Sequence, residues 1–394
     1  MGGAERQWVE ELRAFRAAGI PVIGLTHRSI PPDLAAQLAI PESSVRLLLG
    51  TSALSRIASL RRWLRAAQPA LINSHTSPEL TYLATRGTGI PYVLYHNDPP
   101  FYGFYGDFPY PLALCHRRAY RTLAHNAPDF FEFAPPVAAN ARERLRIEGR
   151  AYLRAIAMSN AAAVVVLSGR SARELKCLYG IEASVVRGCV SDELLSYKPH
   201  FDVRAYHGIG AHPLLVSICR LDSLKRIDVI LRAFKEVQTV EPKAILLIGG
   251  TGSEEEPLKG LAGQLNVSQS VIFTGYLDQN RVWDYFAAAD VFVAPAAGDF
   301  NIAPYEALAL RRKVVVSAEL EIEPELDMSG WIFRAIPDAS GVARAVLTAL
   351  SSPRPRPLDL RNLTWSSRVR RLLVCYAAVV PNAVELRAAS NPSR

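Results

Sequence analysis

Two acidic residues, Asp299 and Glu306, lie seven positions apart in the stretch DVFVAPAAGDFNIAPYEALALRRKVVVS, residues 290–317. Apolar segments flank this stretch, which predicts two buried strands with a loop and a helix between them. Small residues before Asp299 let the backbone approach a ligand closely. Pro304 fits the first position of a helix, which places Glu306 in its first turn. The N–H groups there attract anions, although the helix dipole alone also favours an acid in a first turn.

Two cationic residues follow an earlier predicted strand in VSICRLDSLKRIDVILRAF. The strand ends at Arg220, and Lys225 follows at the start of a helix. Two cations at a strand-to-helix turn suit a diphosphate. Cleavage of a bond to a diphosphate leaving group moves negative charge onto the phosphate oxygens. These cations, helped by the backbone N–H groups of Asn301, Ile302 and Ala303, can stabilise that charge without a metal ion.

The order and spacing of these cations and acids, followed by EALALRRKVVVS, resemble the retaining nucleotide-sugar glycosyltransferases of the sucrose synthase and bacterial mannosyltransferase type (glycosyltransferase family 4, glycosyl transferases group 1). The resemblance runs from Gly2 to about Leu373. It implies the GT-B fold, an α/β architecture of two doubly wound Rossmann-like domains that face a cleft. It also implies transfer of a hexose from a UDP- or GDP-sugar to a glycan or lipid-linked acceptor, with retention of anomeric configuration and no cofactor.

The resemblance also implies roles for individual residues. Asp299 would bind hydroxyls of the donor sugar, Glu306 would bind the ribose, and the backbone near Tyr276 would contact the base. The loop that contains Gly250 would lie beside the nucleotide. We therefore predict a catalytic set of Arg220, Lys225, Asp299 and His96, and a donor-binding set of Glu306, Asn301, Ile302, Ala303, Gly250, Tyr276, Leu277, Gly2 and Gly3.

Two positions depart from the family pattern. The first acid is usually glutamate, so Asp299 is shorter by one methylene. Asn301 replaces the usual glycine, although asparagine tolerates a left-handed backbone better than most residues. These departures keep open a protein that binds a nucleotide-sugar without transferring it. A sugar-nucleotide epimerase on the same fold is a further alternative.

The acceptor side is predicted from two histidines and a loop. His75 in INSHTSPEL and His96 in LYHNDPP end predicted strands, and both resemble family positions near the acceptor and the transferred sugar; a structural role is the alternative. The following stretch, DPPFYGFYGDFPYP, is rich in aromatic residues that suit stacking on sugar rings or a lipid chain, unless the loop packs onto its own domain. The acceptor-side set is His75, Asp98, Phe101 and Tyr102.

Length and composition bound the architecture. The chain has 394 residues, of which 49% are hydrophobic, and this length predicts two domains. No apolar run reaches the length of a membrane-spanning helix, and the start MGGAERQWVE is no signal peptide, so we expect a cytoplasmic protein. The five cysteines lack metal-ligand spacing, which predicts no metal site and reduced, buried cysteines.

Alternation of strands and helices predicts the domain boundaries. They are a first domain at 1–195, a second domain at 196–355, a closing helix at 356–380 and a flexible tail at 381–394. The resemblance implies that the first domain is on the acceptor side, that the second binds the donor, and that the closing helix returns to the first domain. In the family, the turn that corresponds to Gly2 and Gly3 follows a first strand and approaches the donor phosphates or the acceptor. Only Met1 precedes the two glycines here, so we expect that central strand to be absent and its two neighbours to lack a partner.

Positive charge is concentrated in the first half of the chain. Residues 1–200 contain 23 Lys and Arg against 16 Asp and Glu, whereas residues 201–394 contain 22 against 21. The arginines cluster in two predicted helices, SRIASLRRWLRAAQ and CHRRAYRTLAH. Such helices suit an anionic membrane surface or a phosphate-bearing acceptor, and the alternative is a solvated face. No nucleic-acid-binding motif accompanies the charge, so no nucleic-acid partner is predicted.

Overall fold

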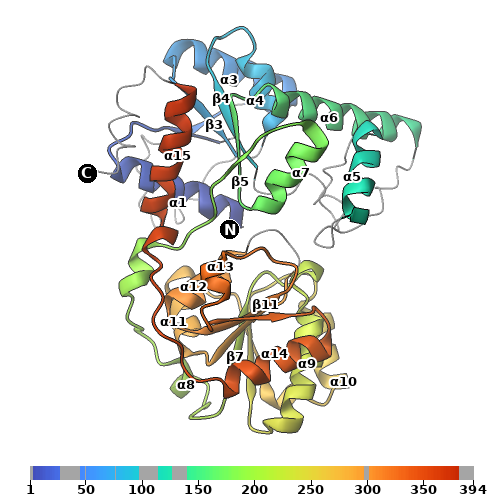
Figure 1. Ribbon diagram of the computed structural model, residues 1–394, viewed down its shortest axis with the longest axis vertical. Coiled ribbons are helices and arrows are strands. Elements are labelled where there is room, and N and C mark those ends of the chain that lie inside the picture. The colour runs from blue at the N-terminus through green and yellow to red at the C-terminus, as the bar shows by residue number, and fades with distance from the viewer. Residues whose placement is uncertain are drawn as a thin grey trace. The chain divides into compact units, whose positions relative to one another are not determined.

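The computed structural model describes residues 3–26, 45–48, 50–75, 77–96, 114–126, 140–296 and 301–380. The chain forms two compact units, unit 1 from residues 1–188 and 365–394 and unit 2 from residues 189–364. Each is an α/β assembly on parallel strands (Figure 1). The division falls after Gly188 and Thr364, whereas the predicted boundaries follow residues 195 and 355.

Unit 2 has a six-stranded parallel sheet in the order β12-β11-β10-β7-β8-β9. This is a doubly wound order, because the chain starts in the middle at β7, builds outward to β9 and then restarts at β10 on the other side. The strands are β7 Leu214–Ile218, β8 Ile245–Gly249, β9 Val271–Gly275, β10 Val291–Ala294, β11 Lys313–Ser317 and β12 Ile332–Ala335.

Helices cover both faces of this sheet. Val291 and Val293 of β10 face a core that contains α9, α10 and α14, while Phe292 between them faces α11 and α12. This alternation is the two-residue period of a strand, here apolar on both faces because both are covered. The helices are α8 Val203–Tyr206, α9 Ile227–Val240, α10 Glu255–Gln264, α11 Gln279–Ala288, α12 Ile302–Ala309, α13 Pro324–Asp327 and α14 Ala339–Ser351.

Unit 1 contains a four-stranded parallel sheet in the order β3-β4-β5-β6 and a separate parallel pair, β1-β2. Among the described residues, strands β1 and β3 each pair with one neighbour, β2 and β4 respectively. The elements are α1 Gly3–Ala17, β1 Gly24–Thr26, β2 Val45–Leu47, α3 Ala53–Ala67, β3 Ile72–Ser74, α4 Pro78–Thr85, β4 Tyr92–His96, α5 Leu114–Asn126, α6 Ala141–Ser159, β5 Ala163–Val166, α7 Gly169–Tyr179, β6 Ser184–Val185 and α15 Trp365–Val379.

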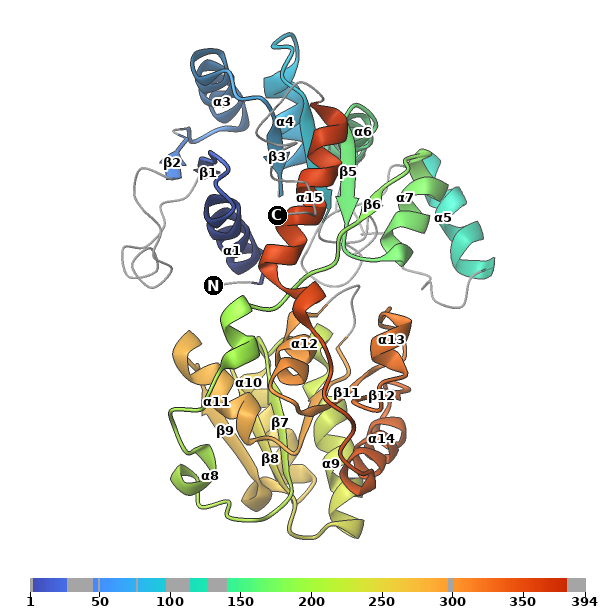
Figure 2. The ribbon, with the colours of Figure 1, turned by 60° about the vertical axis from the view of Figure 1, so that its left-hand side comes forward.

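The first and last helices of unit 1 lie side by side (Figure 2). The rings of Phe15 in α1 and Tyr376 in α15 stack with their centroids 5.9 Å apart. Arg368 of α15 is almost fully buried, and its guanidinium lies 3.4 Å from the carboxylate of Glu11 in α1. The last helix is therefore held in unit 1 by apolar stacking and by a buried ion pair.

Candidate functional site

The switch point of the unit 2 sheet lies between β7 and β10, which are hydrogen-bonded neighbours although one follows the other by three strands. Ligands of doubly wound sheets bind outside the carboxyl ends of the strands at such a point. The predicted cations follow β7 directly, and the predicted acid Asp299 and the start of α12 follow β10. The fold thus brings the loop with the two cations and the start of α12 to one edge of the sheet.

Arg220 and Lys225 both lie near the end of β7, close enough to act electrostatically on Cys219. The side chain of Arg220 is 57% exposed, and its Nε donates a 2.6 Å hydrogen bond to Oδ2 of Asp222. Lys225 closes a 3₁₀ turn through its backbone N–H to the carbonyl of Asp222, and its amine has no ion pair with any residue that the structure describes. Burial raises the pKa of the Cys219 thiol to about 12 against the opposing positive charge of Lys225.

Asp222 is a partner that the sequence analysis did not identify. Its carboxylate neutralises part of the positive charge of Arg220, and it would compete with a phosphate for that guanidinium. The signal was present in the sequence, because an acid two residues after an arginine in a short turn can reach it. Lys225 is therefore the less encumbered of the two cations.

Close packing of the backbone explains why residue 250 is glycine. Its backbone φ is +116°, and an added Cβ would lie 1.8 Å from the carbonyl oxygen of Cys219. The neighbouring Gly252 meets the carbonyl of Leu221 at 2.1 Å in the same way. The loops after β7 and β8 are thus in backbone contact. Close packing accounts for the glycine pattern without a ligand, and the predicted contact of Gly250 with a nucleotide stays a prediction.

The two residues predicted to lie near the base follow β9. Tyr276 is 72% exposed. Leu277 is half-buried, and its side chain lies against Gly249 at the end of β8. The loops after β7, β8 and β9 consequently form a continuous edge, with the exposed Tyr276 ring at one side of it.

The start of α12 differs from the prediction. The helix begins at Ile302, so Pro304 is its third residue and Glu306 lies in the second turn. The prediction that Pro304 opens the helix was wrong, because Asn301 caps it earlier: its Oδ1 accepts the N–H of Ala303 at 3.4 Å. Proline is tolerated at the third position because the first helical N–H groups have no partner within the helix.

Asn301 also has an extended backbone, with φ −130° and ψ 121°, and does not use the left-handed conformation that we considered for it. The side chain of Glu306 is buried, with only 2% exposed. Its Oε1 accepts a 3.2 Å hydrogen bond from the indole N–H of Trp283 in α11, whose ring packs against Tyr197. The sequence analysis did not identify Trp283, because nothing in the local pattern pairs it with Glu306.

The two histidines of unit 1 that were predicted to lie at the site, His75 and His96, have largely buried side chains. Nε2 of His75 lies 3.1 Å from Oε1 of Glu11 and 3.1 Å from the amide nitrogen of Asn73. Burial raises the pKa of Glu11, but the charges and hydrogen bonds of His75 and Arg368 outweigh it and hold the pKa below its usual value. Tyr95 lies against both the His75 ring and the Arg368 guanidinium.

His96 ends β4 in a different environment. Its side chain is buried, and this burial, with the nearby charge of Arg154, holds its pKa well below the usual value. The imidazole is therefore neutral at neutral pH. Its Nε2 has no hydrogen-bond partner among the residues that the structure describes. A neutral, buried imidazole with a free nitrogen can accept or donate one hydrogen bond to a ligand.

Several predicted site residues lie outside the described residues: Gly2, Asp98, Phe101, Tyr102 and Asp299. Gly3 is the first residue of α1. The expectation of buried cysteines was wrong for Cys115 and Cys177, which are exposed on α5 and α7 because their helix positions face away from the core.

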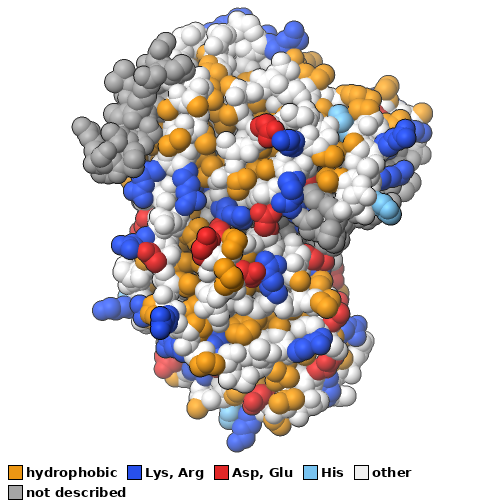
Figure 3. Space-filling model, in the orientation of Figure 1, with side chains coloured by type: hydrophobic (Ala, Val, Ile, Leu, Met, Phe, Trp, Pro, Cys, Tyr) orange, Lys and Arg blue, Asp and Glu red, His pale blue; other side chains and the backbone are white. Residues whose placement is uncertain are grey.

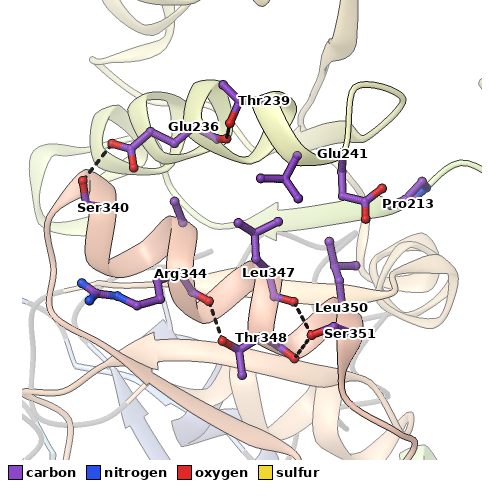
Figure 4. A pocket seen from close by; sticks show the side chains of 12 residues that line it. Pro213, Glu236, Thr239, Glu241, Ser340, Arg344, Leu347, Thr348, Leu350 and Ser351 are labelled. Carbon is purple, nitrogen blue, oxygen red and sulfur yellow. Dashed lines mark hydrogen bonds between the residues drawn. The ribbon is translucent and has the colours of Figure 1, made fainter.

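A groove of about 810 Å³ lies between α9 and α14 (Figure 4). It is lined by Glu236 and Glu241 of the α9 end, by Ser340 and Leu347 of α14, and by Pro213 ahead of β7. Since Pro213 precedes β7 and Glu241 follows α9, this groove lies at the amino ends of the strands. It contains none of the predicted site residues.

Comparison with known families decides the assignment. Glycosyltransferase Family 4 matches residues 1–193, and Glycosyl transferases group 1 matches residues 203–362. The chain belongs to this glycosyltransferase family. A GDP-mannose-dependent α-(1-6)-phosphatidylinositol monomannoside mannosyltransferase from Mycolicibacterium smegmatis is 33% identical over 25% of this chain and 27% of its own length. The sequence match thus spans about a quarter of that relative.

Solved glycosyltransferases share the fold over almost the whole chain. Sucrose-phosphate synthase from Thermosynechococcus elongatus has a TM-score of 0.70 at 18% identity and covers 95% of this chain and 92% of its own. HepE from Anabaena in complex with UDP has a TM-score of 0.64 at 15% identity, covering 99% and 94%. The predicted GT-B fold is confirmed.

Proposed function

We propose that this glycosyltransferase family member is a retaining hexosyltransferase that uses a UDP- or GDP-sugar without a metal ion. The observation that carries the proposal is the pair of cations, Arg220 and Lys225, around the end of β7 at the switch point of the unit 2 sheet. Fixed cations there would stabilise the charge that develops on a departing diphosphate. The relative from M. smegmatis is named for a GDP-mannose donor, and HepE was solved with UDP, which supports both bases as candidates.

The donor can be identified by isothermal titration with UDP, GDP and ADP, with the corresponding monophosphates and with their nucleotide-sugars. We expect one base to bind and a diphosphate to bind far more tightly than its monophosphate. Slow release of free sugar from the matching donor, unchanged by EDTA, would support metal-independent transfer. NMR of the first product anomer would test retention. Failure of every nucleotide to bind would overturn the proposal.

A nucleotide-sugar-binding protein without transferase activity is the second candidate. The pairing of Arg220 with Asp222 at 2.6 Å favours it, because a partly neutralised cation stabilises a leaving phosphate less. Tight binding of a nucleotide-sugar with no release of sugar over hours would favour this candidate over the enzyme.

We further propose a glycan or lipid-linked acceptor and attachment of unit 1 to an anionic membrane surface. Helices α5 and α6 each expose a leucine, Leu114 and Leu145, beside exposed arginines. Cationic (blue) and apolar (orange) side chains lie side by side on that part of unit 1 (Figure 3). Apolar and cationic side chains together suit a lipid headgroup layer. None of the described helices is long and apolar enough to cross a bilayer.

Helix α3 contributes less to such a surface than its sequence suggests. Arg61 donates hydrogen bonds to the carbonyls of Leu83, Ala84 and Arg86, and so caps the end of α4. Replacing Arg118 and Arg121 of α5 with glutamine should weaken binding to anionic vesicles, whereas Arg61→Gln should leave it unchanged. Equal vesicle binding by all variants would overturn the membrane proposal and leave the donor proposal intact.

A further inference from the structure

Arg226 has a backbone conformation that side chains rarely adopt. It follows Lys225 directly, caps the start of α9 and has φ 53° and ψ 40°, in the left-handed region. Glycine enters this region freely, whereas a residue with a Cβ is strained there. The chain therefore carries a long cationic side chain at a position where glycine would be the less strained choice.

The Arg226 guanidinium joins three loops of unit 2. Its Nη1 donates hydrogen bonds to Oε2 of Glu319 at 2.7 Å and to the carbonyl of Pro295 at 3.2 Å, and its Nη2 donates to Oε1 of Glu319 at 3.3 Å. Both side chains of the pair are more than four-fifths buried. Two-point arginine–carboxylate contacts of this kind fix geometry as well as charge.

These contacts cross the switch point of the sheet. Arg226 belongs to the loop after β7, Pro295 to the segment after β10 and Glu319 to the segment after β11. Lys225 is the covalent neighbour of Arg226, and the chain beyond Pro295 leads to the predicted sugar-binding Asp299. The pair thus connects the backbone that carries the predicted phosphate cation to the backbone that leads to the predicted acid.

We propose that Arg226 and Glu319 are a positioning pair that sets the spacing between the phosphate-binding cations and the segment after β10. This inference rests on the proposed function. The pair does not touch the substrate: the guanidinium is already engaged by a carboxylate and a carbonyl. Loss of the pair would let the loops drift apart, and misplacement of a group by about 1 Å can cost roughly 100-fold in rate.

A matched control lies at the amino end of β10. Nη2 of Arg204 contacts Oδ2 of Asp290 at 2.7 Å, just before β10, and Nε of Arg204 donates to the carbonyl of Ala288 at 3.1 Å. Arg204 therefore combines a carboxylate and backbone carbonyls as Arg226 does, but at the amino end of β10. Its loss should lower stability without changing donor binding.

The experiment compares Arg226→Gly, Arg226→Ala, Arg226→Lys, Glu319→Gln, the exchange Arg226→Glu with Glu319→Arg, and Arg204→Ala. For each we would measure the melting temperature, the Kd of the best-binding diphosphate among UDP, GDP and ADP, and kcat and KM for hydrolysis of its sugar. Arg226→Gly and Arg226→Ala should both lower kcat/KM about tenfold or more and should weaken binding of the diphosphate. Glycine should nevertheless melt above alanine, because it relieves the left-handed strain.

Arg226→Lys should recover part of the affinity, since one ammonium can bond to one carboxylate oxygen. The exchanged pair should bind the diphosphate more tightly than Arg226→Ala or Glu319→Gln, because it restores an ion pair. Donor binding equal to wild type in Arg226→Gly, or binding that merely follows the melting temperature across all variants including Arg204→Ala, would overturn the positioning role. A wild type that binds none of the three diphosphates would instead overturn the proposed function, and this inference with it.

Discussion

Charged side chains at the carboxyl ends of the strands are partly exposed in unit 2 and buried in unit 1. In unit 2, Arg220 is more than half exposed and the amine of Lys225 has no ion pair with the described residues. In unit 1, Glu11, His75 and Arg368 are all buried and contact one another or shared neighbours. Charge at the first edge is available to a ligand. Charge at the second edge holds α1, β3 and α15 together, so substitutions at the two edges should affect different measurable quantities.

The largest effect should come from removing one member of the buried group. Glu11→Gln leaves Arg368 in the interior without its carboxylate, and breaking a buried ion pair in this way costs about 3–5 kcal/mol of the free energy of unfolding. Urea denaturation of the isolated variant measures the loss. Glu182→Gln is the control in the same unit, because Glu182 pairs with Lys176 and both side chains are exposed, so its loss should cost about 0–1 kcal/mol.

The buried glutamate also predicts the direction of a pH effect. Since the folded pKa of Glu11 is below its ordinary value of 4.5, its contribution is complete above that value and is lost as the pH falls through the folded pKa. The acid limb of wild-type stability should therefore flatten in Glu11→Gln. An equally steep limb below pH 4.5 in both proteins would contradict the ion-pair account of unit 1.

The exposed edge should respond in turnover and not in stability. Lys225→Ala removes the cation without an ion pair and should lower kcat by about 100- to 1,000-fold while the melting temperature stays unchanged. Arg220→Ala should cost less, because Asp222 already neutralises part of its charge. Asp222→Asn tests this ranking: it should raise the activity of the wild type but leave Arg220→Ala unaffected. Equal losses in the two alanine variants would show that Asp222 does not attenuate Arg220.

The sequence predicted the features that depend on neighbouring residues and missed those that depend on contacts between distant ones. Apolar runs and adjacent charges are readable within a short window, so the sequence predicted the strands that end near Arg220, His75 and His96, the two strands on either side of residues 295–312, and the turn at Arg220 and Lys225. The contact of Arg368 with Glu11 joins residues 357 positions apart and leaves no local trace. The start of α12 was misplaced because a proline rule was preferred to the stronger capping signal of Asn301.

A smaller loss of stability should show whether Gly250 is required for close packing of the β7 and β8 loops. Gly250→Ala places a methyl group 1.8 Å from the carbonyl oxygen of Cys219. It also strains the backbone, and this strain alone costs about 1–3 kcal/mol of the free energy of unfolding. Gly210→Ala, in the same unit with φ +57° and nothing near its added Cβ, carries only the strain. Chemical denaturation should rank Gly250→Ala clearly below Gly210→Ala, and similar values would mean that the β7 and β8 loops separate easily.

The smallest effect, and the one that bears most directly on the acceptor side of unit 1, is the pH dependence due to His96. Its folded pKa lies well below the ordinary 6.5, so below pH 6.5 the unfolded chain takes up a proton that the folded protein does not. Stability should fall on acidification by at most about 1.4 kcal/mol per pH unit from this group. The window from pH 6.5 to 4.5 distinguishes His96 from Glu11, whose contribution is lost only below it. His96→Gln should reduce the slope in that window, to which His116 and His207 also contribute because burial lowers their pKa values, and exposed His212→Gln should keep it. If the slope of His96→Gln equals that of the wild type, the imidazole is already charged in the folded protein and cannot act as the neutral hydrogen-bonding group that we assign to it.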